Sequence, residues 1–367
     1  MAKKSKDGSE TSGPIDYVKL AADSINKLLG KNVCTDTAEF LSRPKHIIKW
    51  SPSLDLILSG GIPEGSWVSV SGPPKTGKTT SLLYLAAKAQ RPEYGNKTVW
   101  YLNVEGRIKE MNLNGIKGLI HTDPSRFRLI GSTEEKLMTT EDYLNAADTI
   151  LKTQPGAFII IDSMSALADG REVEGGVGTQ TRGNNQKLIS QFVNNACNLV
   201  PVRNAILCGV NHIYSNTSGK GPPRVEKTSA RWLYQADVRL RLIMSKPWVS
   251  GGEEIGKEIT WKCEAAALGG PNKMISSRLR YNVGIDEVAE ILQFGKSSGL
   301  IEEAAAGGWC SLVYLAEQCG GEDKVPKLQG LERLSAYMDE HPEHYELLRS
   351  QIASMSGGLV KVDSSED

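Results

Sequence analysis

The chain has 367 residues, of which 40% are hydrophobic and 23% are charged, values typical of a soluble protein that can bury a sizeable core. Lys and Arg balance Asp and Glu at 43 each, so the net charge predicts no nucleic-acid or membrane partner, and such a partner would need a local patch. The six scattered cysteines form no CxxC pair, and no apolar run resembles a signal peptide or a membrane span. We therefore expect reduced thiols and a cytoplasmic protein without membrane association.

The N-terminal part of the chain is expected to lie outside the main core. Residues 1–14 are polar and predict a disordered tail. The stretch IDYVKLAADSINKLL, residues 15–29, repeats apolar residues at helical spacing and is followed by Gly30, which predicts an amphipathic helix. This helix could fold back on its own core, or residues 15–45, including the segment around Val33, could serve oligomerisation by docking on a neighbouring copy.

The middle of the chain, residues 46–300, alternates strand and helix patterns. Helical patterns cover residues 81–90, 140–152 and 184–199, and apolar strand candidates occupy residues 67–72, 98–104, 157–162, 204–211, 236–244, 257–265 and 276–283. Apolar strands that alternate with helices predict an α/β core whose mostly parallel central sheet is covered on both faces. The later strands lie close together and predict antiparallel hairpins, while residues 301–367 predict a small helical region with an acidic end.

The stretch GPPKTGKT, residues 72–79, is a complete G-x-x-x-x-G-K-[ST] motif between a predicted strand and a predicted helix. Backbone N–H groups of such a loop surround phosphate oxygens, Lys78 would reach the β and γ phosphates, and the Thr79 hydroxyl would hold Mg²⁺. A Gly-rich turn with an incidental lysine is the alternative, but the strand and helix on either side favour ATP binding. The residues predicted to bind the nucleotide are Gly72, Pro73, Pro74, Lys75, Thr76, Gly77, Lys78, Thr79 and Thr80.

Three further polar residues follow predicted strands. Asp162 ends AFIIID, as expected of a Walker B carboxylate near the metal, although an ordinary helix-capping Asp is the alternative. Glu105 ends VWYLNVE and could orient the attacking water, or it could be a solvated surface residue. His212 follows AILCGVN and could sense the γ-phosphate, although a lone histidine is more often a structural hydrogen-bonding group.

Two loops carry candidate DNA-binding residues. The first, about residues 172–187, is rich in glycine and holds Arg182, with Lys187 at its end. The second, about residues 213–231, begins a region in which residues 219–246 carry seven basic and two acidic side chains. This local excess predicts contact with a polyanion, and a merely mobile, solvated loop is the alternative. The basic residues of the second loop are Lys220, Arg224, Lys227 and Arg231.

Taken together and in this order, these motifs resemble the RecA/UvsX family of strand-exchange recombinases over about residues 15–298. The segments that carry the resemblance are SPSLDLILSGGIPEGSWVSVSGPPKTGKTT, the strand ending in Glu105, IIIDSMSAL, EVEGGVGTQTRGNNQKLISQ and VNHIY. The resemblance implies a RecA-type P-loop ATPase core in which Glu105 is the catalytic glutamate and the two loops bind DNA. His212 stands where bacterial RecA has Gln, so the chain looks closer to the phage UvsX-like branch.

The resemblance also extends to the subunit interface. RLRYNVGIDEVAEILQFGKSSGLIE is similar to the closing core segment of the family and implies that Tyr281 packs near a nucleotide bound by the neighbouring subunit. Lys109 and Asn112 replace an Asp and a Tyr on the adenine side of bacterial RecA. An interfacial lysine pair of RecA corresponds to Lys262 and Glu264, so one cation is missing or is supplied by Lys273.

The resemblance implies an ATP- and Mg²⁺-dependent, DNA-stimulated ATPase that forms helical filaments of its own copies on single-stranded DNA. The filament would pair this strand with homologous double-stranded DNA in recombination and repair, with a loading mediator and a single-stranded-DNA-binding protein as further partners. Two alternatives stay open: a hexameric RecA-fold helicase, and a mediator paralogue that does not exchange strands. The origin also stays open between a cell and a phage acting in its host's cytoplasm.

Overall fold

The computed structural model describes residues 16–30, 33–42, 45–169, 182–216 and 224–359, and the chain divides into two units at Lys45/His46. The first unit contains the helices α1 (Tyr17–Leu29) and α2 (Thr37–Ser42). Helix α1 begins after Asp16, whose carboxylate accepts hydrogen bonds from two backbone N–H groups of the first turn, and it ends at Gly30, where φ is 119°. The predicted N-terminal helix is therefore present, and within the described residues none of its side chains is buried.

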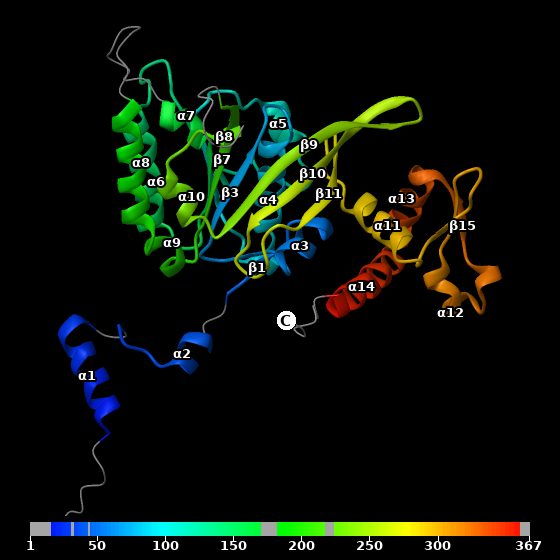
Figure 1. Ribbon diagram of the computed structural model, residues 1–367, viewed down its shortest axis with the longest axis horizontal. Helices are drawn as coiled ribbons and strands as arrows, with labels where there is room; N and C mark the ends of the chain where they lie inside the picture. The colour runs from blue at the N-terminus through cyan, green and yellow to red at the C-terminus, as the bar shows by residue number, and fades with distance from the viewer. Residues whose placement is uncertain (1–15, 31–32, 43–44, 170–181, 217–223, 360–367) are drawn as a thin grey trace, which may run out of the picture. The chain divides into compact units, whose positions relative to one another are not determined.

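The second unit is built on a twisted central sheet (Figure 1). Within the described residues its strand order is β12-β11-β10-β9-β3-β7-β6-β4-β5, and β8 pairs with the end of β7. The strands are β3 (Trp67–Gly72), β4 (Val99–Asn103), β5 (Phe127–Ile130), β6 (Phe158–Asp162), β7 (Ile206–Ser215), β8 (Arg224–Glu226), β9 (Val238–Ser250), β10 (Glu253–Ala265), β11 (Met274–Arg280) and β12 (Gly284–Ile285).

The central strands run parallel, and the strands from β9 to β12 are joined by antiparallel pairing, as the spacing of the strand patterns predicts. The β9–β10 hairpin extends beyond the other strands in Figure 1. Apart from the main sheet, β1 (Ile47–Ile48) and β2 (Ile62–Pro63) form a short antiparallel pair.

Helices cover both faces of the sheet, because neighbouring residues of its buried strands point to opposite sides. On β6, Ile160 packs in one core with α4, whereas Ile159 and Ile161 pack in a second core with α6 and α8. The predicted doubly covered α/β core is thus confirmed. The helices of this part are α3 (Pro52–Leu58), α4 (Lys78–Ala89), α5 (Glu110–Asn114), α6 (Thr140–Thr153), α7 (Met164–Asp169), α8 (Arg182–Ala196), α9 (Leu199–Val202) and α10 (Ala230–Gln235).

The C-terminal region follows α11 (Glu287–Ser297) and is mainly helical, with α12 (Ala316–Cys319), α13 (Gly330–Glu340) and α14 (Pro342–Leu359). Helices α11, α13 and α14 enclose a third apolar core around Leu292, Leu334 and Leu348. The sequence patterns missed a small antiparallel sheet here, because its strands β13 (Glu302–Glu303), β14 (Trp309–Ser311) and β15 (Lys327–Gln329) have only two or three residues each. None of the described helices combines the length and the apolar character that a bilayer span requires.

Candidate active site

The register of the parallel strands brings the predicted site residues to one edge of the sheet. Gly72 at the end of β3 pairs with His212 on β7, and Asp162 at the end of β6 pairs with Asn103 at the end of β4. Glu105 follows two residues after Asn103. Because parallel strands end at the same edge, four segments that are far apart in the sequence meet there.

The phosphate loop joins β3 to α4, as predicted. Its last glycine, Gly77, has φ of 98° and precedes the first residue of α4, Lys78. A Cβ atom at Gly77 would lie 2.2 Å from Leu279 Cδ1, the end of a side chain that can shift, so it is mainly the positive φ that favours glycine here. This loop ends at a helix N-terminus, which favours anions.

Lys78 is almost completely buried, with 4% of its surface exposed. Its Nζ donates hydrogen bonds to the carbonyl oxygens of Gly72, at 3.0 Å, and Pro73, at 2.7 Å. Burial lowers the pKa of Lys78 to about 8, and the nearby carboxylates of Asp162 and Glu105 oppose this shift. The lysine therefore remains mostly cationic at neutral pH and lies where a phosphate group would enter the loop.

Asp162 accepts hydrogen bonds from two hydroxyl groups. Its Oδ2 accepts hydrogen bonds from Thr79 Oγ1 at 2.6 Å and from Tyr101 Oη at 2.7 Å. Burial raises the pKa of Asp162, and the two hydrogen bonds oppose that rise. A buried carboxylate next to a threonine hydroxyl offers the hard oxygen ligands that Mg²⁺ prefers, so this pair fits a magnesium ion.

Glu105 lies across from this pair and is partly exposed. Its Oε1 accepts a hydrogen bond from Ser163 Oγ at 2.6 Å and lies next to His212 Nε2, while its Oε2 is 3.4 Å from Arg107 Nη1. The His212 hydrogen bond is the main reason that the pKa of Glu105 falls to about 2. The carboxylate is thus ionised at neutral pH and can accept a hydrogen bond from a water molecule.

These groups line a cavity of about 730 Å³. The predicted loop residues Pro74, Lys75, Thr76, Gly77, Lys78, Thr79 and Thr80 contribute to its wall, together with Glu105, Asp162 and His212. Asn112 also lines it, whereas Lys109 is the N-cap residue of α5. Tyr281 lies on the wall of the chain's own cavity, and its role beside a neighbouring subunit's nucleotide stays a prediction.

A second cavity, of about 410 Å³, shares Pro74, Glu105, Arg107 and His212 with the first and continues to Tyr214. It leads towards the base of the second predicted DNA-binding loop. There β8 returns antiparallel to β7, and the backbone N–H of Lys227 donates to the carbonyl oxygen of His212 at 3.2 Å. His212 therefore contacts Glu105 with its ring and the returning loop strand with its backbone.

The other predicted DNA-binding residues are only partly described. Lys220 and the side chains of Arg182 and Arg224 lie outside the described residues. Lys187 is exposed on α8, and Lys227 Nζ lies over the Tyr214 ring at 5.1 Å from its centre. Arg231, on α10, donates to Asn194 Oδ1 at 3.0 Å. No DNA contact of these residues is tested by the geometry, so all of them stay predictions.

The predicted interface residues also stay predictions. Val33 is half-exposed in the first unit, and Lys262 lies on β10. Glu264, which the resemblance matches to the second interfacial lysine, has a partner within the chain. It pairs with Arg239 and Arg241, each at 2.9 Å, and the same two arginines also pair with the buried Glu226 side chain on β8.

Sequence reasoning missed several residues of the site. Tyr101 binds Asp162, and Ser165 Oγ accepts a hydrogen bond from the backbone N–H of His212 at 2.8 Å. The alternation of β4 contained a signal for Tyr101, because Tyr101, Asn103 and Glu105 are two residues apart and all three line the cavity. No comparable pattern marks Ser165, since its role depends on the close approach of α7 to β7.

Comparison with known proteins agrees with this geometry. The RecA N-terminal domain matches residues 16–286. Protein RecA of Thermus thermophilus is 26% identical over 349 residues, which cover 93% of this chain and 94% of the relative. Protein RecA of Lactobacillus johnsonii is 24% identical over 346 residues, covering 92% and 88%, and that of Colwellia psychrerythraea is 26% identical over 325 residues, covering 86% of each chain. Because the domain match spans well over half of its residues, the chain belongs to the RecA family.

Proposed function

We propose that the protein is an ATP-dependent DNA strand-exchange recombinase that acts as a helical filament on single-stranded DNA. The observation that supports this most directly is the position of His212. Its ring contacts the carboxylate suited to orient water, and its backbone holds the strand that returns from the basic loop. A nucleotide site and a polyanion-binding loop are thus joined through one residue.

In the proposed reaction the phosphate loop binds ATP, whose γ-phosphate is the group transferred to water. Lys78 donates hydrogen bonds to the β and γ phosphates, and Thr79 and Asp162 would hold Mg²⁺, which would neutralise phosphate charge. Glu105 accepts a hydrogen bond from a water molecule and orients it for attack on the γ-phosphate. The low pKa of Glu105 suits it to position water rather than to take a proton early in the reaction.

His212 would couple this chemistry to DNA binding. Its ring can contact Glu105 or a γ-phosphate, and its carbonyl oxygen accepts a hydrogen bond from Lys227, so a displacement of the whole residue would reach the β7–β8 hairpin. ATP would thereby favour the conformation of the loop that binds DNA, and hydrolysis would release it. The proposed DNA contacts are Arg182, Lys187, Lys220, Arg224, Lys227 and Arg231.

Residues 15–45 and Lys262 are proposed to form contacts between copies in the filament, with residues 46–300 as the ATPase core and residues 301–367 as an accessory region. A loading mediator, a single-stranded-DNA-binding protein and a cytoplasmic location belong to the same proposal. The UvsX-like branch and a phage origin depend only on His212 and the C-terminal region, and the bacterial relatives named above do not support them.

The test is ATP hydrolysis with and without long single-stranded DNA, with negative-stain microscopy of the same samples. DNA-stimulated hydrolysis together with helical filaments is expected. Closed rings with hydrolysis would instead indicate a helicase-type motor. If DNA does not stimulate hydrolysis and no assembly forms, the protein would instead be a mediator paralogue.

A further inference from the structure

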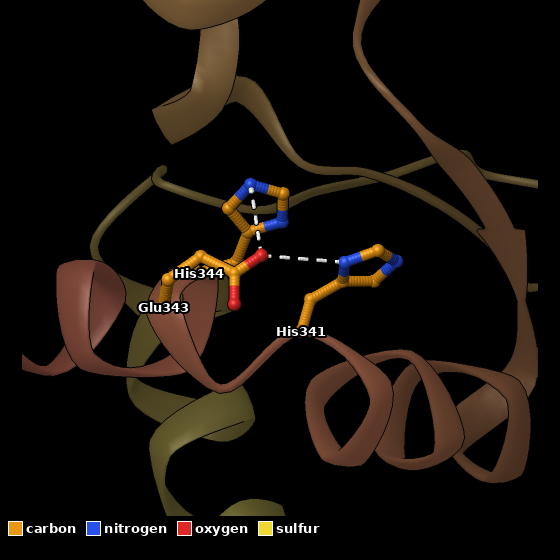
Figure 2. Close-up of side chains that lie close together, drawn as sticks. All are labelled: His341, Glu343 and His344. Atoms are coloured by element: carbon orange, nitrogen blue, oxygen red, sulfur yellow. Dashed lines mark ion pairs between the residues drawn. The ribbon is translucent and has the colours of Figure 1, made fainter.

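A cluster of three potential metal ligands lies in the C-terminal region, at the corner between α13 and α14 (Figure 2). His341 connects the two helices, and Glu343 and His344 belong to the first turn of α14. His341 Nδ1 is 3.4 Å and His344 Nε2 is 4.0 Å from the same atom, Glu343 Oε1. A ring nitrogen of each imidazole therefore lies within 4.0 Å of one carboxylate oxygen, and the His344 ring would have to turn to aim its Nε2 lone pair at a shared ion (Figure 2).

The separations suit a small divalent ion. Bonds of about 2.0–2.2 Å from zinc to nitrogen and oxygen, in tetrahedral geometry, place the ligand atoms about 3.3 Å apart. All three ligand atoms lie within 4.8 Å of one another, so rotations of the exposed Glu343 and of the two half-buried histidines would be needed to reach this geometry. The side chains of His341, Glu343 and His344 are 41%, 64% and 22% exposed, which leaves a path for the ion.

The backbone and a tyrosine hold the two histidines in place. The carbonyl oxygen of His341 accepts hydrogen bonds from the backbone N–H groups of His344, at 3.0 Å, and Tyr345, at 3.2 Å. Tyr337 Oη lies 2.9 Å from His344 Nδ1, and the Tyr337 ring packs against the His341 ring with centres 4.3 Å apart. When Nδ1 donates to this hydroxyl, the lone pair of His344 is on Nε2, the ring nitrogen that lies 4.0 Å from Glu343 Oε1. Hydrogen bonds of this kind orient metal-binding histidines in other proteins.

An ordinary ion pair is the alternative reading of the cluster. A glutamate in the first turn of a helix is stabilised by the helix dipole, and it would attract a protonated histidine. That account explains one histidine beside Glu343. It does not explain why both imidazoles lie within 4.0 Å of the same oxygen while Tyr337 contacts Nδ1 of one ring and the face of the other.

We propose that His341, Glu343 and His344 bind one zinc ion, with water as the fourth ligand. Two imidazoles and one carboxylate favour zinc over magnesium, which prefers oxygen ligands only. The ion would tie the end of α13 to the start of α14. This site uses none of the residues of the ATPase site, so it does not depend on the proposed recombinase function.

The test is calorimetric titration of the full chain with zinc chloride. Mg²⁺ is kept in excess and no nucleotide is added, because the phosphate oxygens of a nucleotide would themselves bind zinc. One zinc ion per chain is expected. Binding should be lost when His341→Ala and His344→Ala are combined, and Tyr337→Phe, which keeps all three ligands, should weaken it about 10- to 100-fold.

His121→Ala and Cys319→Ser are matched controls, because they remove a histidine and a half-buried thiol outside the cluster; both should bind zinc like the wild type. Substitution with Co²⁺ should give a tetrahedral spectrum without a sulfur-to-metal band. The proposal is overturned if the wild type binds no zinc, if the double variant binds it equally well, or if Cys319→Ser abolishes binding. If the double variant does not fold, Glu343→Gln, which changes the most exposed ligand, takes its place in the zinc titration.

Discussion

The nucleotide site has two sides that share one edge of the sheet but differ in construction. The phosphate side, Lys78, Thr79, Asp162 and Tyr101, is largely buried, with Lys78 and Asp162 only 4% and 8% exposed. The sensor side, Glu105, Arg107 and His212, is more exposed: the side chains of Glu105 and His212 are 16% and 17% exposed, and that of Arg107 is 81% exposed.

The pKa values of the carboxyl groups on the two sides shift in opposite directions. Burial dominates at Asp162 and raises its pKa, whereas the His212 hydrogen bond dominates at Glu105 and lowers its pKa. The phosphate side is therefore held by hydrogen bonds inside the core, and the sensor side by a contact that a ligand can replace. We therefore expect mutations to separate nucleotide binding from the proposed coupling to DNA.

Removing the lysine of the phosphate side should have the largest effect. Lys78→Ala removes the only buried cation among the described residues of the phosphate loop. Nucleotide affinity should fall, and ATP hydrolysis should fall about 10³-fold. Steady-state hydrolysis and calorimetric ATP binding measure this. Lys117→Ala, an exposed lysine elsewhere, is the control. Unchanged hydrolysis in Lys78→Ala would refute the phosphate-loop assignment.

Glu105→Gln should impair ATP hydrolysis without impairing ATP binding or DNA binding. The amide cannot orient water as a carboxylate does, so hydrolysis should fall about 10²-fold, while ATP and DNA binding persist because the phosphate side is intact. Single-turnover hydrolysis and DNA binding in the presence of ATP measure the two effects. Glu110→Gln, an exposed glutamate on α5, should behave like the wild type. Normal turnover of Glu105→Gln would exclude a role in orienting water.

The loop beyond the sensor side should show its contacts through salt dependence. Replacing Lys220, Arg224 and Lys227 with Ala should weaken single-stranded DNA binding between about tenfold and 100-fold and reduce the slope of log affinity against log salt by about 2. The control removes three lysines outside the loop, Lys117, Lys136 and Lys152. An unchanged slope in the loop variant would show that these residues do not contact phosphate.

The smallest expected effect is the pH dependence of the phosphate side. With its pKa near 8, Lys78 loses its proton as the pH rises, so affinity for Mg²⁺–ATP should fall about tenfold between pH 7 and pH 9. Calorimetry in two buffers should show uptake of nearly one proton on binding at pH 9, and absence of uptake would contradict the prediction. The folded pKa lies below the unfolded value of 10.5, so this lysine makes the free energy of unfolding rise between pH 8 and pH 10.5.

The sequence predicted the parallel part of the sheet well because its strands are continuous apolar runs with a polar residue at the end. Asp162 after FIII and His212 after ILCGVN mark one edge, and the resulting cluster followed from topology alone. The strand β5 escaped notice because only one of its four residues, Phe127, is buried. An edge strand of this kind lacks the alternation that reveals longer strands.

Contacts between elements were harder to foresee. The contact of Ser165 with His212 and the network of Glu226 with Arg239 and Arg241 join segments that are distant in the sequence, and neither has a local pattern. In the C-terminal region, HPEH could be read from the sequence, but the role of Tyr337 depends on how α13 meets α14. Contacts of this kind between side chains depend on how the elements pack. No local periodicity in a single sequence reveals that packing.

The direct pairing of Gly72 with His212 also limits how this protein can change in length. In a strand, adding or deleting one residue turns every later side chain to the opposite face. A single-residue insertion in β7 before His212 would therefore direct the imidazole away from Glu105, even with every side chain of the site retained. We expect the chain to accept length variation between β8 and α10 far more readily than within the ladder that joins β3 to β7.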